Sequence, residues 1–192
     1  MSTAAPRRRY TLADYLDVEE RSPTVKHELV AGEIFAMAGG SVEHSALATA
    51  FTGLLLAHLR GTPCRPHGSD LRIAITPANA YTYADAAVVC DPVERAPHSP
   101  SHVTNPRVVM EVLSPSTEAY DRDDKRLLYQ HLASLGEYVL VAQDRRRVEV
   151  WTRTGDAWSH TVHDAGSRAA LPSIGFELEV DELYRLAGVD VP

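Results

Sequence analysis

Two carboxylates and one lysine in the middle of this 192-residue chain are the side chains best suited to chemistry. Asp85 lies in Y-A-D-A-A-V-V-C-D, Glu111 in V-V-M-E-V-L-S-P-S-T and Lys125 in D-R-D-D-K-R-L-L-Y. The apolar runs around both acids predict strands that are buried on both faces. A carboxylate buried there needs a cationic partner, because an unpaired charge is costly to desolvate. A divalent metal or an arginine would meet that need.

The carboxylate oxygens of Asp85 and Glu111 limit which metal ions could bind. Two carboxylates with room for water suit Mg²⁺ or Mn²⁺, which prefer oxygen ligands. The Cys and His spacing that is typical of zinc sites does not occur in the sequence. We therefore predict that Asp85 and Glu111 are ligands of Mg²⁺ or Mn²⁺ if the metal is the partner.

Lys125 is unusual because lysine is rare in this chain. Only Lys26 and Lys125 are lysines among the 19 basic residues, so the other 17 are arginines. A lysine ammonium can act as a compact point charge beside a water molecule, which a planar guanidinium cannot do in the same way. The spacing of Lys125, Leu128, Tyr129 and Leu132 predicts the inward face of a helix. Alternatively, Lys125 extends to the surface or pairs with Asp121.

Two further residues are candidates for supporting roles. Glu28 lies in the first half of H-E-L-V-A-G-E-I-F-A-M, which predicts a β-hairpin about Ala31-Gly32. It is either an exposed strand residue or a third acid that reaches the site. His44 follows Ser41, a predicted N-cap of a helix that extends to about Arg60 with Leu47, Phe51, Leu54, Leu55 and His58 on its buried face. It is either a hydrogen-bonded core histidine or a phosphate contact.

Length and composition predict one ordinary globular domain, residues 11–188, after a flexible tail, residues 1–10. Signal-peptide and membrane-span patterns are not found, and Cys64 and Cys90 are expected to be reduced, so we expect a cytoplasmic protein. A net charge of −7 argues against broad adhesion to nucleic acid but not against a nuclease. The arginine clusters at 7–9 and 145–147 fit a solvated tail and a turn, or a contact with nucleic acid.

The remaining pattern predicts the elements that position these residues. Thr11 is a predicted cap of a helix to about Glu20, and residues 70–75 predict a half-buried strand. Residues 92–106 predict a long loop. The helix that carries Lys125 is expected to end at Gly136 and to be followed by a strand at 137–142 in a mixed, partly parallel sheet. Residues 147–152 and 157–163 predict a hairpin, and 181–186 a final helix.

This order of elements resembles the restriction-endonuclease-like PD-(D/E)XK superfamily. Within it, H-E-L-V-A-G-E, Y-A-D-A-A-V-V-C-D, E-V-L-S-P-S-T and D-R-D-D-K-R-L-L-Y resemble the Uma family of predicted endonucleases, over roughly residues 15–179. The resemblance implies an α/β (α+β) fold, a four-stranded mixed sheet flanked by helices, with metal ligands Asp85 and Glu111. Ala84 replaces the superfamily's proline, and Leu113 stands where its lysine is expected. Lys125 is the candidate replacement, with Tyr129 beside it.

The resemblance leads us to expect a Mg²⁺- or Mn²⁺-dependent endonuclease that hydrolyses phosphodiester bonds of nucleic acid, with DNA as the expected substrate. Lys125 would orient the attacking water or stabilise developing charge, and Glu28 would be an outer ligand. A catalytically silent nucleic-acid-binding module and a hydrolase of a small phosphodiester are the alternatives. The 92–106 segment and the hairpin with Trp151 and Trp158 suggest apolar surface that a homodimer would cover.

Overall fold

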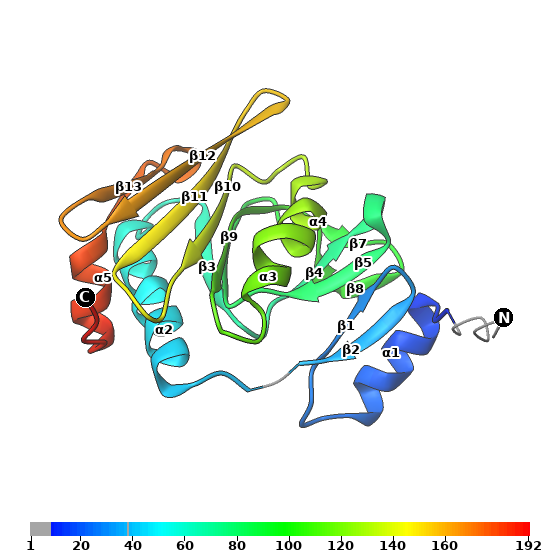
Figure 1. Ribbon diagram of the computed structural model, residues 1–192. Coiled ribbons are helices and arrows are strands. Elements are labelled where there is room, and N and C mark those ends of the chain that lie inside the picture. The colour runs from blue at the N-terminus through cyan, green and yellow to red at the C-terminus, as the bar shows by residue number, and fades with distance from the viewer. Residues whose placement is uncertain (1–8, 38) are drawn as a thin grey trace, which may run out of the picture.

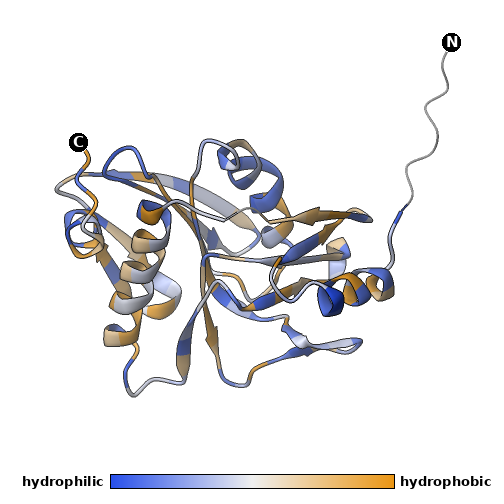
Figure 2. Cartoon of the chain, turned by 90° about the horizontal axis from the view of Figure 1, so that it is seen from below, coloured by the Kyte–Doolittle hydropathy of each residue, from blue (hydrophilic) through white to orange (hydrophobic). Residues whose placement is uncertain are grey.

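The computed structural model describes residues 9–37 and 39–192, which form a mixed α/β structure with two sheets side by side (Figure 1). Most of the predicted N-terminal tail, including Arg7 and Arg8, lies outside the described residues. None of the helices in the described part of the chain has both the length and the apolar character needed to cross a membrane. Hydrophobic residues concentrate on the strands of the interior (Figure 2).

The central sheet carries Glu111. Among the described residues it has six strands rather than the four implied by the resemblance, because a C-terminal hairpin and an edge strand extend it. Its strands are β3 (Cys64–Gly68), β6 (Ala86–Cys90), β9 (Pro106–Val112), β10 (Glu137–Val141), β11 (Arg147–Thr154) and β12 (Ala157–Asp164). The order is β12-β11-β10-β9-β6-β3, with β9 and β10 parallel and the other pairs antiparallel. The predicted mixed sheet and late hairpin are confirmed.

Alternation along β9 decides which way Glu111 points. Val108, Met110 and Val112 pack into the core on one face of the sheet, whereas Val109 and Leu113 pack on the other. Side chains alternate across a strand, so Glu111 lies on the face of Val109 and Leu113. The first face is covered by α2 (Val42–His58), α5 (Val180–Ala187) and the small sheet of β13 (Arg168–Leu171) and β14 (Phe176–Glu179).

The helix α2 confirms the prediction from Ser41, whose hydroxyl accepts a hydrogen bond from the His44 backbone N–H at 3.0 Å. One member of its predicted buried face is wrong. His58 is exposed, and its ring lies against Phe176 while Nε2 lies 3.0 Å from the Ile174 carbonyl oxygen. The contact with the small C-terminal sheet replaces burial in the core.

The second face of the central sheet is covered by a broken helical segment. It consists of α3 (Glu118–Tyr120), the π-helical turn η2 (Asp121–Lys125) and α4 (Arg126–Gln130). The helical segment ends at Gln130 and not at Gly136 as predicted. After Gln130 the Arg153 guanidinium from β11 donates to backbone carbonyl oxygens, those of Gln130, Leu132 and Leu135. Gly136 instead precedes β10, where an added Cβ would lie 2.5 Å from Ser173 Cβ.

The second sheet lies beside the first and carries Glu28. Its strands are β1 (His27–Val30), β2 (Glu33–Ala36), β4 (Arg72–Ile75), β5 (Ala80–Tyr83), β7 (Arg95–Ala96) and β8 (Ser99–Val103), in the order β2-β1-β5-β4-β8-β7. The predicted β1–β2 hairpin is confirmed, with Ala31 and Gly32 both at positive φ. The helix α1 (Leu12–Arg21) packs on this sheet, and Thr11 forms the predicted cap. Two short 3-10 helices, η1 (Thr76–Ala78) and η3 (Pro172–Ile174), complete the elements.

Three segments differ from their predictions. Residues 92–106 are not a structureless loop, because β7 and β8 pair with each other and β8 pairs with β4. The predicted strand at 70–75 begins only at Arg72. The predicted first acidic strand is two strands, β5 and β6, and Asp85 lies in the bend between them. The chain leaves one sheet after Tyr83 and enters the other at Ala86, so the acid stands at the junction of the sheets.

The prediction of two reduced cysteines is wrong. Cys64 on β3 and Cys90 on β6 form a disulfide, at a position where the two residues are directly paired between antiparallel strands. They are 26 residues apart in the sequence. Only the register of β3 against β6 brings them together, and no local pattern predicts that register.

Candidate active site

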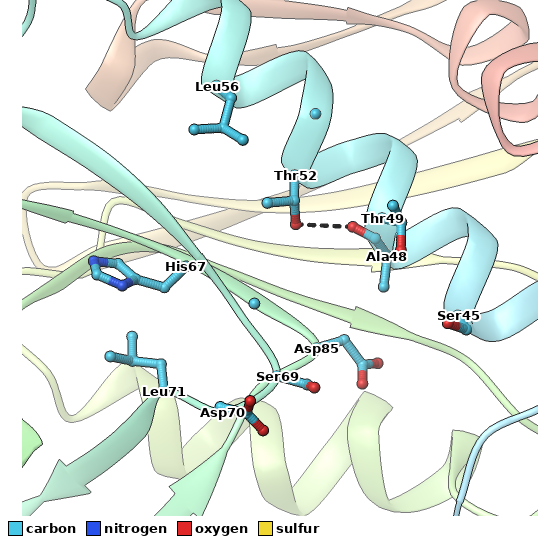
Figure 3. Close-up of a pocket in the computed structure, with 12 residues that line it drawn as sticks. Ser45, Ala48, Thr49, Thr52, Leu56, His67, Ser69, Asp70, Leu71 and Asp85 are labelled. Carbon is cyan, nitrogen blue, oxygen red and sulfur yellow. Dashed lines mark hydrogen bonds between the residues drawn. The ribbon is translucent and has the colours of Figure 1, made fainter.

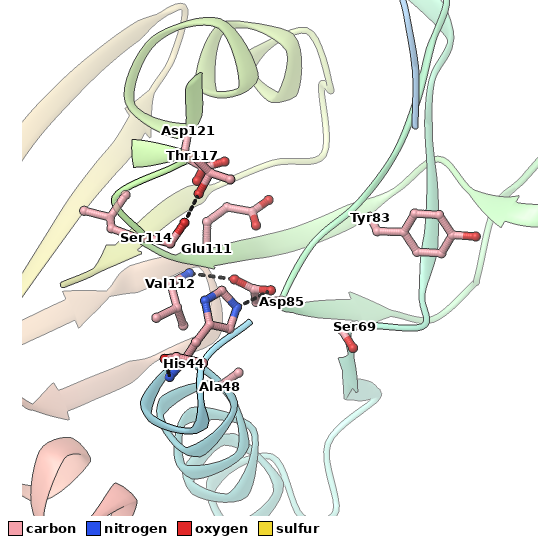
Figure 4. Close-up of polar contacts among 12 residues, drawn as sticks. His44, Ala48, Ser69, Tyr83, Asp85, Glu111, Val112, Ser114, Thr117 and Asp121 are labelled. Atoms are coloured by element: carbon pink, nitrogen blue, oxygen red, sulfur yellow. Dashed lines mark hydrogen bonds and ion pairs between the residues drawn. The ribbon is translucent and has the colours of Figure 1, made fainter. Parts of the chain in front are cut away.

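The candidate site lies at the junction of the two sheets, beneath the broken helix. Asp85 comes from the bend between β5 and β6, Glu111 from β9, and Asp121 from the first position of η2, as Figure 4 shows. Lys125 ends the same π-helical turn, and Glu28 comes from β1. The structure therefore brings together five residues from four separate segments of the chain.

Lys125 is buried at the centre of this cluster, with 4% of its surface exposed. Its Nζ lies 3.0 Å from Glu111 Oε1, 3.2 Å from Glu28 Oε1 and 4.0 Å from Asp121 Oδ1. Of the two alternatives raised from the sequence, the surface position is wrong, because Lys125 is buried. The pairing with Asp121 is present, but it is the longest of the three contacts of Lys125 with acids.

Asp85 is held by two donors from different elements. The Val112 backbone N–H donates to Asp85 Oδ2 at 2.7 Å, and His44 Nε2 lies 2.9 Å from Asp85 Oδ1 (Figure 4). This hydrogen bond with Asp85 is the main reason why the pKa of His44 is raised. His44 is therefore a largely buried, hydrogen-bonded histidine that orients Asp85 from the N-terminal part of α2. Its contact with a phosphate stays a prediction.

Glu28 reaches the site from the neighbouring sheet. Its side chain is 8% exposed, which excludes the exposed-strand alternative. Besides its contact with Lys125, Glu28 Oε1 accepts a hydrogen bond from the Tyr83 backbone N–H at 3.1 Å. Glu28 thus joins the end of β5, just before Asp85, to the helical lysine.

Burial and charge act in opposite directions within the cluster. Desolvation raises the pKa of Glu111 well above its usual range, although Lys125 lowers it and Asp85 raises it further. Burial by itself would lower the pKa of Lys125, but Glu111 and Glu28 raise it well above its usual range. Burial also raises the pKa of Asp121, again partly offset by Lys125. Lys125 therefore stays an ammonium among four acids.

One oxygen of the cluster lacks a good hydrogen bond. Lys125 Nζ is at ion-pair distance from Glu111 Oε1, yet this buried oxygen accepts no well-directed hydrogen bond from the described residues. A hard divalent cation would satisfy it and would offset the excess of carboxylates. No group of three or more His, Cys, Asp or Glu side chains is arranged to hold a metal within residues 9–37 and 39–192. Two carboxylates such as Asp85 and Glu111 are a donor set that suits an ion such as Mg²⁺, which takes few protein ligands and keeps water.

Tyr129 lies beside the cluster in a supporting position. Its hydroxyl donates to the Tyr83 carbonyl oxygen at 3.2 Å and accepts from Thr82 Oγ1 at 3.1 Å. It is fully buried and has no direct hydrogen bond to Lys125. Tyr129 therefore holds the end of β5 against α4, which fixes the backbone immediately before Asp85.

Sequence reasoning missed two contributors. Asp121 was considered only as a salt-bridge partner, but it is buried and faces the cluster. Tyr138 on β10 donates from its hydroxyl to the Asp121 carbonyl oxygen at 2.9 Å and so supports the π-helical turn. The spacing of Asp121 and Lys125 was a usable signal, because residues four apart share a helix face. The contact of Tyr138 depends on tertiary packing and had no signal in the sequence.

The mixed sheets, the acid at their junction and the flanking helices define a restriction-endonuclease-like fold, as the sequence predicted. A crystal structure described as "a putative nuclease belonging to DUF820", from Anabaena variabilis ATCC 29413, is similar with a TM-score of 0.75 and 18% identity. The similarity covers 92% of this chain and 98% of that chain.

The chain belongs to the Uma2 family, described as "Putative restriction endonuclease", whose model matches residues 12–181. It is 40% identical over 185 residues to the uncharacterised protein slr1290 of Synechocystis sp. (strain ATCC 27184 / PCC 6803 / Kazusa), with 96% of each chain covered. It is 33% identical over 156 residues to sll1609 of the same organism, covering 81% of this chain and 88% of the relative. The predicted family is confirmed, and membership supports a nuclease.

Proposed function

We propose that this protein is a metal-dependent endonuclease that hydrolyses phosphodiester bonds of nucleic acid, with DNA as its substrate. The observation that carries the proposal is the buried ammonium of Lys125, 3.0 Å from a Glu111 oxygen that has no well-directed hydrogen bond. A buried cluster with more acids than cations is expensive to keep without a function that needs it. Family membership supplies the reaction class.

Asp85 and Glu111 would hold the ion, Mg²⁺ or Mn²⁺, and Glu28 would act as an outer ligand. The bound ion would polarise the phosphate and lower the pKa of the attacking water. Its positive charge also explains how an acidic chain, with net charge −7, would accept a polyanion at this one place.

The protein's own residues would position the reacting groups. Lys125, held by Glu28 and Glu111, keeps its proton and so orients water or stabilises negative charge as an ammonium rather than as a base. His44 and the Val112 N–H fix the Asp85 carboxylate. Such prior orientation means that little reorganisation is needed during the reaction.

The test is an assay with Mn²⁺ on plasmid, single-stranded DNA, RNA and a small phosphodiester, using wild type and two variants. Asp85→Asn and Glu111→Gln should both lose cleavage, while Asp156→Asn, at an exposed turn, should keep it. Cleavage of the small phosphodiester alone would indicate a small-substrate hydrolase. Nucleic-acid binding without cleavage of any substrate by wild type would indicate a silent binding module and overturn the proposal.

A further inference from the structure

An open groove of about 700 Å³ lies between α2 and the turn that joins β3 to β4. Asp85 is one of its lining residues, so the groove opens beside the candidate site (Figure 3). Thr49, Thr52 and Leu56 line it from α2, and His67 and Leu71 line it from the opposite side. A volume in this range matches that of small-molecule sites, which bind ligands of a few rings.

Gly53 explains why the groove is open on the α2 side. It lies in the interior of a helix and lines the groove. An added Cβ would meet nothing within 4 Å among the described residues, and the backbone is not in the left-handed region. Neither packing nor conformation therefore requires glycine there, although glycine weakens a helix relative to alanine. A longer side chain at this position would project into the groove.

The lining offers hydrogen bonds but little attraction for phosphate. The hydroxyls of Ser45 and Thr49 and the ring of His67 make no hydrogen bond with other described residues. Burial lowers the pKa of His67, so its neutral ring has one donor and one acceptor. Within the part of the chain that the structure describes, no Lys or Arg lines the groove, and its charged residues are Asp70 and Asp85.

These properties fit the uncharged part of a nucleotide. Phosphates of single-stranded and duplex DNA are both bound mainly by basic residues, and none lines this groove among the described residues, so the groove suits a base and sugar rather than a phosphate. A base within a duplex is also stacked and paired, so it cannot enter a pocket unless it is unstacked. An unpaired base presents its edge to hydroxyl and imidazole groups directly.

We propose that this groove binds the base and sugar of an unpaired nucleotide next to the phosphate that would lie at the ion held by Asp85 and Glu111, so that the enzyme acts on single-stranded DNA. This inference rests on the proposed nuclease function. It goes further in naming the strand state of the substrate and the residues that select it, Thr49, Gly53 and His67.

The test is fluorescence anisotropy of a short labelled single-stranded DNA and of a blunt duplex with the same sequence. Both are titrated with full-length protein in Ca²⁺, and gels verify that the DNA stays intact. Wild type should bind the single strand more tightly than the duplex. Gly53→Leu should weaken binding of the single strand by about tenfold or more, with Gly53→Ala in between and His67→Ala also weaker.

The matched control is Ala57→Leu, which adds the same side chain to an exposed position of α2 outside the groove and should bind as wild type does. Thermal melting checks that each variant is folded, and Thr49→Leu replaces Gly53→Leu if the latter is not. Tighter binding of the duplex by wild type, or wild-type affinity in a folded groove-filling variant, would overturn the inference.

Failure of the nuclease proposal gives a different result. If wild type cleaves nothing but shows the expected pattern of affinities, the groove binds single strands and the hydrolytic assignment is wrong. If wild type cleaves DNA and filling the groove changes neither affinity nor strand preference, the groove assignment alone is wrong.

Discussion

At the scale of single residues, the chemistry depends on how Lys125 is buried. The rarity of lysine in the sequence singled out Lys125, and the nearby Glu111 and Glu28 raise its pKa above the usual range although burial opposes them. An ammonium with a raised pKa cannot act as a base near neutral pH. Its value to a nuclease lies in charge and position, and substitutions can separate these two properties.

Lys125→Arg keeps the charge but replaces a compact ammonium with a larger planar group in a buried site. We expect phosphodiester cleavage to fall by about 10² to 10³, the usual effect of losing one transition-state contact. Mn²⁺ affinity by calorimetry should change little, since Lys125 is not a ligand. Lys125→Met tests loss of the charge. Lys26→Arg, at the other lysine, is the control, and wild-type turnover in Lys125→Arg would refute the catalytic role.

Glu111→Gln replaces a buried acid with a neutral group of the same shape. We expect Mn²⁺ binding to be lost in calorimetry and the metal-free protein to melt about 2–4 °C higher, as expected for roughly 1 kcal/mol in a protein of this size. The reason is that burial, and to a smaller extent the neighbouring acids, raise the pKa of Glu111 in the metal-free state, so an ionised Glu111 lowers stability near neutral pH. Glu20→Gln, at an exposed position, serves as the control. A variant with undiminished Mn²⁺ affinity would exclude Glu111 as a ligand.

At the scale of elements, alanine should have opposite effects on stability at two glycine positions. Gly53→Ala in α2 should stabilise the protein by about 0.5–1 kcal/mol, because the new Cβ meets no atom and alanine favours the helix. Gly136→Ala should destabilise it, because its Cβ would meet Ser173 at 2.5 Å. Urea unfolding measures both. Destabilisation by Gly53→Ala would show that this glycine has a packing role that the structure does not reveal.

The disulfide joins the edge strand β3 to β6, whose first residue follows Asp85. Closing a loop between residues 26 apart should stabilise the fold by roughly 3 kcal/mol. Dithiothreitol should therefore lower the stability of wild type in urea but not that of Cys64→Ser/Cys90→Ser. Thiol titration of unfolded, non-reduced wild type should find no free thiol, and two thiols would contradict the pairing. The cytoplasmic location stays a prediction, and a disulfide would be unusual in that compartment.

At the scale of the whole molecule, the homodimer stays a prediction, but the structure suggests a different surface for it. Arg126 covers Trp151 and Arg153 covers Trp158, so these tryptophans are less available than expected. The eight-residue strand β12 instead forms a sheet edge without a partner among the described residues, and Val162 is 47% exposed. Long regular edges of this kind tend to pair with another copy.

Light scattering at micromolar concentration should show a dimer for wild type. Val162→Glu should shift it to monomer, because a charge at the pairing edge opposes association. Leu186→Glu, at another exposed apolar residue on α5, should not. Light scattering that shows only monomer for wild type would contradict the predicted dimer.

The sequence by itself determined what depends on neighbours along the chain. The Thr11 and Ser41 caps, the Ala31-Gly32 turn, the β11–β12 hairpin and the inward face of Lys125 follow from local hydrogen bonds and periodicity. The family motifs also lie in short contiguous stretches.

Only the tertiary structure decided the rest, because it depends on pairings between distant segments. The register of β3 with β6 joins Cys64 to Cys90, and the crossing between sheets places Asp85 in a bend rather than in a strand. Burial of Glu28 and Asp121 around Lys125 follows from packing η2 over both sheets. Contacts between distant segments leave no signal in the local sequence. The sequence pattern therefore identified the candidate residues but did not predict that they lie close together.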